Sequence, residues 1–289
     1  MNYLGHFGLR EPPFSITPDT SFFYPCRSTQ EALNTLLIAL ESGEGIIKIT
    51  GEVGTGKTLL CRKFLATLDD AYWVSAYVPN PNLEPRTLLL ALAEELNAKT
   101  DPGADQHSLL KAINRMLLDM ARSRRRVVLC MDESQAMPLD TLETVRLLTN
   151  LETEKRKLLH VVLFGQPELD QKLANRSIRQ LRQRITFQYD LHVLDEREVA
   201  AYFAHRIAVA GYRGRPLLSQ AARRALYRAS RGVPRLVNIL AHKSLLLLYG
   251  EGGDCLEAGH VHAATLDTPA ARQARRWWRL PLGLSRAAR

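Results

Sequence analysis

Apolar and polar residues along the first two thirds of the chain follow a repeating order of short buried strands and amphipathic helices. Short apolar, β-branched runs predict strands at residues 45–51, 71–78, 126–133, 158–166 and 185–191. Helical periodicity separates them at residues 29–42, 57–68, 85–97, 105–123 and 139–157. Strands that are apolar throughout and alternate with helices predict a five-stranded parallel sheet covered by helices on both faces.

The pattern changes after about residue 194, where three helical stretches follow one another and no strand is apparent. We therefore expect an α/β domain over residues 1–194, in which residues 1–28 form an N-terminal segment. A small all-helical domain follows over residues 195–268, and a basic tail over residues 269–289 that we expect to be poorly ordered.

Composition agrees with a globular chain, because 46% of its 289 residues are hydrophobic and 24% are charged. The net charge of +9 and the pI of about 9.6 suit nucleic acid, an anionic membrane surface or a polyanionic ligand, without choosing among them. The four cysteines lack metal or redox spacing, which favours a reducing compartment. No signal-peptide pattern and no apolar run long enough to span a bilayer is present, so we expect a cytoplasmic protein.

A phosphate-binding pattern lies between the first predicted strand and the following helix. The stretch "GEVGTGKT" (51–58) fits G-x-x-x-x-G-K-[ST] at every fixed position. Gly51, Gly54 and Gly56 allow a tight turn in which successive backbone N–H groups point at phosphate oxygens. A chance glycine-rich turn is the alternative, and the strand before and helix after the motif argue against it.

Side chains of the same loop complete the expected nucleotide site. Lys57 supplies a charge for the β- and γ-phosphates, and Thr58 offers its hydroxyl to Mg²⁺. The following helix adds its N-terminal dipole. The remaining residues expected to line the nucleotide are Glu52, Val53, Thr55 and Leu59.

Two acids close the strand at 126–133 in "VVLCMDE". In open α/β sheets ligands bind at the carboxyl ends of strands, so Asp132 is expected to hold Mg²⁺ and Glu133 to polarise an attacking water. The alternative is that the two acids only cap the next helix. A dehydrogenase is excluded because no G-x-G-x-x-G opens the first unit, while a small-molecule kinase stays formally open. We therefore expect an Mg²⁺-dependent nucleoside triphosphatase.

Several further stretches resemble one family. They are "FGLREPPFSITPDTSFFY", "GEVGTGKTLLCRKFL", "VVLCMDESQAMP", "LLTNLETEKRKLLHVVLFGQPEL", "LRQRITFQYDL" and "SRGVPRLVNILAHKSLLLLYGEG". Together they resemble AAA+ ATPases of the ExeA/GspA group, over nearly the whole chain. The resemblance implies a P-loop ATPase with a helical lid, ATP and Mg²⁺ as ligands, and a ring-like, nucleotide-dependent homo-oligomer.

The resemblance also implies roles for individual residues. Phe7, Gly8 and Leu9 match a segment beside the adenine, with packing of the N-terminus onto the core as an equal alternative. Gln166 matches sensor 1, which contacts the γ-phosphate or the attacking water. Arg235 matches sensor 2 on a lid helix, with a surface arginine as the alternative.

Two arginines precede the last predicted strand in "QLRQRITF" (180–187). By resemblance, Arg184 is the residue that reaches a neighbouring subunit's nucleotide, and Arg182 is the fallback or a second interface contact. Solvated surface charge is the alternative for both. Three further arginines in "SRRRV" (123–127) are interpreted as a solvated helix C-terminus rather than a nucleic-acid patch.

The resemblance implies that ATP hydrolysis serves assembly of a type IV pilus of the mannose-sensitive haemagglutinin type, or of a type II secretion-like apparatus, at the inner membrane. The expected partners are the chain itself and assembly proteins there. A DNA-binding ATPase that assists transposition and a nucleotide-gated interaction switch are the alternatives, but we do not expect nucleic acid as a partner. The tail "RRWWRLPLGL" leaves open weak contact with an anionic membrane surface or simple disorder.

Overall fold

Contacts divide the chain into two compact units. The computed structural model describes residues 3–101, 103–153 and 156–272. An α/β unit spans Pro25–His192, and a helical unit combines Met1–Tyr24 with Val193–Arg289. The first boundary differs from the sequence expectation, which placed residues 1–28 with the sheet. The second lies beside the expected boundary at residue 194.

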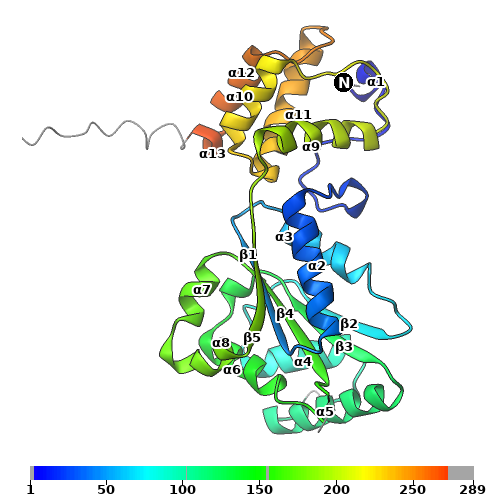
Figure 1. Cartoon of the computed structure of the whole chain (residues 1–289), viewed down its shortest axis with the longest axis vertical. Helices are drawn as coiled ribbons and strands as arrows, with labels where there is room; N and C mark the ends of the chain where they lie inside the picture. The colour runs from blue at the N-terminus through cyan, green and yellow to red at the C-terminus, as the bar shows by residue number, and fades with distance from the viewer. Residues whose placement is uncertain (1–2, 102, 154–155, 273–289) are drawn as a thin grey trace, which may run out of the picture. The chain divides into compact units, whose positions relative to one another are not determined.

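The α/β unit is built on a parallel sheet with strand order β2-β3-β4-β1-β5 (Figure 1). The strands are β1 (Ile46–Gly51), β2 (Trp73–Val78), β3 (Arg126–Met131), β4 (Leu159–Gly165) and β5 (Ile185–Leu191). Every residue of β1 and β4 is buried, whereas burial alternates along the edge strand β5. The predicted five-stranded parallel sheet, followed by a helical region, is confirmed.

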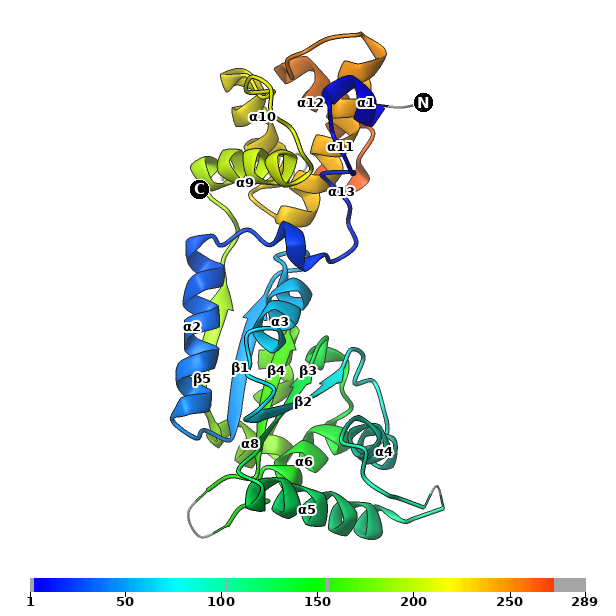
Figure 2. The same ribbon diagram turned by 90° about the vertical axis from the view of Figure 1, so that its right-hand side faces the viewer.

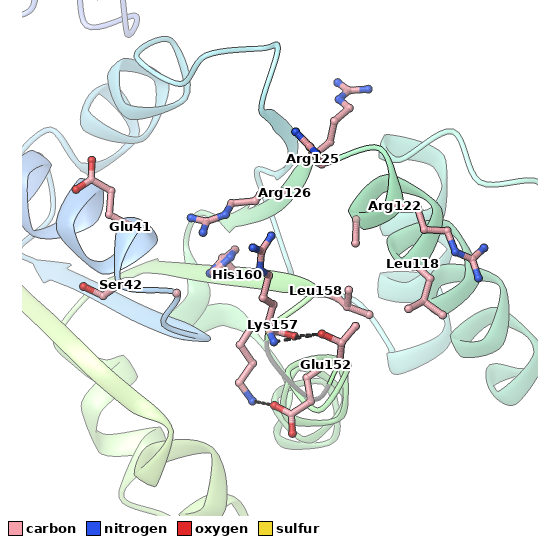
Figure 3. A pocket seen from close by; sticks show the side chains of 15 residues that line it. Glu41, Ser42, Leu118, Arg122, Arg125, Arg126, Glu152, Lys157, Leu158 and His160 are labelled. Carbon is pink, nitrogen blue, oxygen red and sulfur yellow. Dashed lines mark hydrogen bonds and ion pairs between the residues drawn. The ribbon is translucent and has the colours of Figure 1, made fainter.

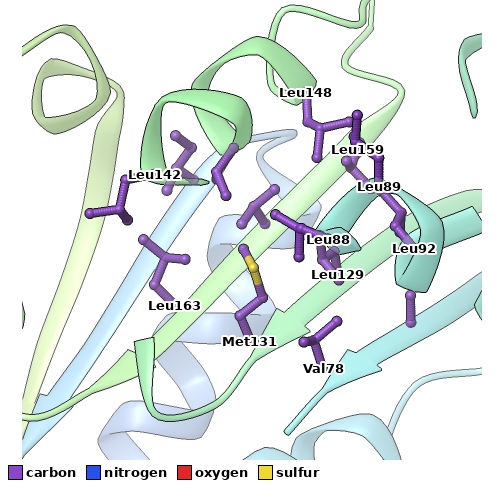
Figure 4. Packing of buried hydrophobic residues seen from close by; sticks show 14 of the residues in the cluster. Val78, Leu88, Leu89, Leu92, Leu129, Met131, Leu142, Leu148, Leu159 and Leu163 are labelled. Atoms are coloured by element: carbon purple, nitrogen blue, oxygen red, sulfur yellow. The ribbon is translucent and has the colours of Figure 1, made fainter. Parts of the chain in front are cut away.

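Helices cover both faces of the sheet (Figures 1 and 2). One apolar cluster joins the sheet to α2 (Arg27–Glu41) and α3 (Lys57–Leu65) through Leu36, Phe64 and Cys61. A second cluster joins the other face to helices through Leu92, Leu142 and neighbouring side chains (Figure 4). The helices that contribute to it are α4 (Pro85–Glu95), α5 (Gln106–Arg122), α6 (Leu139–Leu148), α7 (Glu168–Leu173) and α8 (Arg179–Gln183).

The helix expected over residues 139–157 is wrong in its second half. Helix α6 ends at Leu148, and the backbone N–H groups of Asn150 and Leu151 bond the carbonyls three residues back instead of four. Farther along, Glu152 and Lys157 form an antiparallel bridge and an ion pair. Residues 151–153 and 156–158 therefore lie in the connection before β4 rather than on a helix.

The helical unit holds one more long helix than the sequence suggested. Its helices are α1 (Tyr3–Phe7), α9 (Glu196–Val209), α10 (Gln220–Ser230), α11 (Pro234–Gly250), α12 (Ala258–Leu266) and α13 (Pro269–Arg272). Helix α12 was missed, although Glu257 and His260 form a reciprocal cap at its start. A single 3-10 turn lies at Thr20–Phe22 in this unit, and two more lie at Ser134–Ala136 and Arg176–Ile178 in the α/β unit.

A buried arginine fixes the N-terminal segment within the helical unit. The Arg206 side chain is 4% exposed, and its Nε donates to the Pro13 carbonyl at 2.5 Å. The guanidinium also lies over the ring of Phe22, 4.7 Å from its centroid. Phe14 packs against Phe203 of α9. These contacts explain why residues 3–24 join the helical unit and not the sheet.

Along the part of the chain that the structure describes, no helix is both long enough and apolar enough to cross a bilayer. The expected tail begins with the short helix α13, and its remainder, residues 273–289, lies outside the described residues.

Gly232 should be indispensable to the helical unit. Its φ is +74°, and an added Cβ would lie 1.9 Å from the Leu194 carbonyl oxygen. We expect Gly232→Ala to lower the free energy of unfolding by about 2–4 kcal/mol, as urea unfolding followed by circular dichroism would show. Gly252→Ala is the matched control, since Gly252 has φ +67° and open space around it, so backbone strain alone should cost about 1 kcal/mol. Equal losses in the two variants would contradict the steric argument.

Candidate functional site

The phosphate loop joins β1 to α3. Gly54 and Gly56 have φ of +84° and +98°, a left-handed conformation that side chains with a Cβ rarely adopt. At Gly51 a Cβ would lie 2.9 Å from that of Leu191, so the motif's first glycine allows close approach to β5. Each of the three glycines thus has a local structural reason, and the loop leads directly into the N-terminus of α3.

Other side chains of the loop differ in exposure. Glu52 and Val53 are exposed, Leu59 is half-buried, and Thr55 is buried with its hydroxyl donating to the Glu52 carbonyl at 2.8 Å. The loop therefore combines an internally braced turn with an open outer side.

The side chain of Lys57 is held by carbonyl groups of the phosphate loop itself. Its side chain is only 5% exposed, and Nζ donates to the carbonyls of Gly51 and Glu52 at 2.8 and 2.9 Å. Burial lowers the pKa of Lys57, and the nearby carboxylates of Glu133 and Asp132 oppose that shift. The ammonium group is therefore a partly desolvated cation, whose attraction for an anion is stronger than in open water.

Asp132 and Thr58 converge from neighbouring elements. The Thr58 hydroxyl, on the first turn of α3, donates to Asp132 Oδ2 at 2.5 Å, and Asp132 directly follows β3. Asp132 is 2% exposed, and burial raises the pKa of its carboxyl group. A buried carboxylate beside a hydroxyl is a pair of hard oxygen ligands of the kind that Mg²⁺ accepts while keeping several waters. Among the described residues no group of three or more His, Cys, Asp or Glu could hold a metal.

Glu133 is held by two amide groups. Its backbone is left-handed, with φ +50°, and its Oε2 accepts hydrogen bonds from Gln166 Nε2 at 3.0 Å and Gln135 Nε2 at 2.6 Å. Gln166 follows β4, the neighbour of β3, so parallel pairing brings the two strand ends together. The structure thus places Glu133 and Gln166 in direct contact, as residues of one site.

Gln135 is a residue of this network that the sequence analysis missed. Its amide has two partners, because Nε2 donates to Glu133 while Oε1 accepts from the backbone N–H of Gln166 at 3.0 Å. A Cβ at Gly165 would lie 2.8 Å from Leu169 Cδ2 and 3.4 Å from Gln135 Oε1. The available signal was a long amide side chain two residues after Glu133, which a search for charged and nucleophilic groups passes over.

Arg184 and Arg182 lie at the opposite end of the strands. Ile185 pairs with Ile46, the first residue of β1, whereas the phosphate loop begins at Gly51. At about 3.3 Å per residue the two ends of β1 are roughly 16 Å apart. Arg184 Nη1 donates to the Thr149 hydroxyl at 3.2 Å, and Arg182 is exposed. The α/β unit therefore does not bring either arginine to its own phosphate loop.

The other expected residues belong to the helical unit. Arg235 is exposed on the first turn of α11, directly after Pro234. Phe7 and Leu9 are each 7% exposed, which is the burial expected of the alternative in which this segment packs onto the core.

The sheet, the loop and the acids at the strand ends together define the class of the α/β unit. Residues 40–173 match the family described as "AAA domain". This range contains the phosphate loop, Asp132, Glu133, Gln135 and Gln166. Residues 40–173 of the chain are therefore similar to an AAA domain.

One curated protein similar to this chain is General secretion pathway protein A of Aeromonas hydrophila. The two are 40% identical over 276 residues, which cover 95% of this chain and 50% of that protein. The chain thus spans about half the length of this curated relative.

Solved structures share the fold at low sequence identity. The ADP form of ORC2 from Aeropyrum pernix has a TM-score of 0.64 at 19% identity, over 88% of this chain and 72% of that one. Cdc6p from Pyrobaculum aerophilum gives 0.63 at 17%, over 86% and 71%. The Holliday junction branch migration motor RuvB from Thermotoga maritima gives 0.53 at 15%, over 83% and 68%. Likeness at such identity shows the fold alone.

Proposed function

We propose that this protein is an Mg²⁺-dependent ATPase whose hydrolysis drives assembly of a secretion or pilus apparatus. The observation that carries the enzymatic part is the Glu133 carboxylate, fixed by two amides beside the Thr58–Asp132 pair and the phosphate loop. A loop that only bound nucleotide would need no oriented carboxylate at this point. The arrangement supports hydrolysis because an attacking water must be held and relieved of a proton.

Each residue then has a defined task. The loop N–H groups and Lys57 bind the phosphates, and Thr58 and Asp132 would hold Mg²⁺. When bound, the ion supplies positive charge beside the β- and γ-phosphates. Glu133 orients the water through the carboxylate oxygen that the two amides leave uncovered. Gln166, which contacts Glu133, is assigned to the γ-phosphate or that water by resemblance. Arg235 is assigned to the γ-phosphate from the lid, by resemblance.

The biological role rests on relationship. General secretion pathway protein A, at 40% identity, supports a task in type II secretion. The finer resemblance, to the pilus-biogenesis ATPase MshM, supports assembly of a type IV pilus of the mannose-sensitive haemagglutinin type. In either case we propose a nucleotide-dependent ring that works on assembly proteins at the cytoplasmic face of the inner membrane. Affinity purification of the Glu133→Gln protein from its host, with ATP present, would identify the trapped partners.

Glu133→Gln should separate binding from hydrolysis. The amide keeps a similar shape but cannot accept a proton, so we expect ATP affinity within about threefold of the parent and turnover at least 100-fold lower. Fluorescent-nucleotide titration and phosphate release would measure the two. Glu168→Gln is the control, because the Glu168 charge also reaches Lys57 from an exposed position on α7. Unchanged turnover in Glu133→Gln would remove Glu133 from the mechanism.

Gln135 should act by positioning Glu133. We expect Gln135→Ala to lower kcat about tenfold with the KM for ATP nearly unchanged, since the phosphates do not depend on its amide. Gln135→Glu should be slower still, because a second carboxylate repels that of Glu133 and removes the amide donor that holds it. If both variants show the parent's kcat, Gln135 has no part in the reaction.

Arg184 should serve the site of a neighbouring subunit. Because it lies at the far end of the strands from its own phosphate loop, Arg184→Ala and Lys57→Ala each damage a different part of one shared site. Each variant alone should be nearly inactive, and an equimolar mixture should recover a measurable part of the parent's turnover. Arg182→Ala gives the comparison for the second arginine. Absence of recovery where light scattering shows mixed assemblies would contradict a role in trans.

A further inference from the structure

A basic hollow lies at the end of the sheet where the strands begin, on the side away from the phosphate loop. Its volume is about 870 Å³, and it is bordered by the ends of α2 and α5 and by the starts of β3 and β4 (Figure 3). Six basic side chains line it, against two carboxylates, Glu41 and Glu152. The basic residues are Arg122, Arg124, Arg125, Arg126, Arg156 and Lys157.

Half of these cations already have partners. Arg122 pairs with Asp119, Lys157 pairs with Glu152, and Arg126 donates to the Leu40 carbonyl at 3.2 Å. The guanidinium of Arg126 also lies over the Trp73 ring, 5.5 Å from its centroid. These three side chains therefore build the wall of the hollow, and an incoming ligand would have to break existing contacts to engage them.

The other three arginines are available. Arg124, Arg125 and Arg156 are exposed, and their side chains make no hydrogen bond or ion pair with any other described residue. Three unpaired guanidinium groups on one concave surface repel one another, which a negatively charged ligand would relieve. The surface thus has a charge excess that the fold does not use for its own stability.

Arg124 occupies a position at which glycine would cost less. It follows the C-terminus of α5 with φ +59°, and its N–H bonds the Ala121 carbonyl as the helix ends. Left-handed residues that end helices are usually glycine, because a Cβ is strained there. An arginine at this place adds strain while directing a charge to the hollow, so its benefit is expected to lie outside the fold.

The hollow continues along α5. A second depression of about 430 Å³ shares Leu118 and Arg122 with the first and adds Lys111 and Arg115 from the same helix face. The combined surface is a groove, which suits an extended segment better than a single small anion. We define it as the basal groove, lined by the residues of these two depressions.

We propose that the basal groove binds an acidic segment of a partner protein. An acidic peptide brings carboxylates for Arg124, Arg125 and Arg156, and its backbone N–H groups can pair with the carboxylates of Glu41 and Glu152. Apolar side chains of such a segment would contact Leu118 and Leu158, which line the same groove. The lining thus offers a partner for each kind of group that a peptide presents.

Nucleic acid and membrane fit this lining less well. Single strands are bound through stacking on aromatic side chains, yet the lining contains no Phe, Tyr or Trp. A phosphodiester chain would also face three carboxylates, Glu41, Asp119 and Glu152, and it has no backbone N–H group to donate to them. A flat bilayer surface cannot follow a concave groove. The mixture of cations, carboxylates and leucines is therefore that of a protein-binding surface.

The groove can be tested in the full chain with two labelled probes, a peptide of ten glutamates and an oligonucleotide of ten thymidines. The test variant combines Arg124→Gly, Arg125→Ala and Arg156→Ala. The control removes three exposed arginines of α10, as Arg223→Ala, Arg224→Ala and Arg228→Ala. We expect the test variant to weaken peptide binding about tenfold and the control less than about threefold, by fluorescence anisotropy. ATP turnover of the test variant should stay unchanged.

Equal loss of peptide binding in the test and control variants would overturn the proposal, since net charge alone would then explain the binding. Selective loss of oligonucleotide binding, with peptide binding kept, would assign the groove to nucleic acid instead. Arg124→Gly alone supplies a second criterion. It should weaken peptide binding while leaving the melting temperature unchanged or higher, and a lower melting temperature would mean that Arg124 serves the fold.

Discussion

Parallel pairing of five strands is the constraint on which the rest of this structure depends. It places every strand's carboxyl end at one edge of the sheet, so that the phosphate loop after β1, the acids after β3 and Gln166 after β4 meet there without further adjustment. The same pairing places every amino end at the other edge. Arg184 before β5 and the arginines before β3 are therefore kept away from their own phosphate loop by the topology itself. The length of the strands separates the two sets of side chains.

At the carboxyl edge, charges of both signs are removed from water close together. Lys57 and Asp132 are each nearly inaccessible to solvent. Burial lowers the pKa of Lys57 and raises the pKa of Asp132, and both shifts favour the neutral form. Their mutual attraction opposes these shifts. The two glutamine amides give Glu133 neutral donors, which hold a carboxylate without adding a further charge. In the proposed mechanism, a site built in this way would stabilise added phosphate charge and hold an acceptor for a proton.

The sequence predicted those features that depend on local spacing. The phosphate loop, Asp132 and the number and direction of the strands follow from glycine positions and from continuous apolar runs. Features that depend on side chains distant in sequence were not accessible. The backbone bonds that close α6 do not show in its sequence pattern, Gln135 is recognised only by its contact with Gln166 after another strand, and Arg206 binds Pro13 from α9. The pattern "SRRRV" is also the same whether its arginines are solvated at a helix end or line a groove, because the groove is formed with residues distant in sequence.

The contact between Arg206 and Pro13 joins residues 193 positions apart, across the whole of the α/β unit. The N-terminal segment emerges first from the ribosome but cannot complete its contacts until α9 has been made. The α/β unit, whose residues lie in one uninterrupted stretch, can fold during that interval. The helical unit, by contrast, must close a loop that contains an entire folded domain. The order of synthesis therefore produces a nucleotide-binding domain before its companion, and a nascent chain passes through a stage in which the phosphate loop exists while the helical unit is still incomplete.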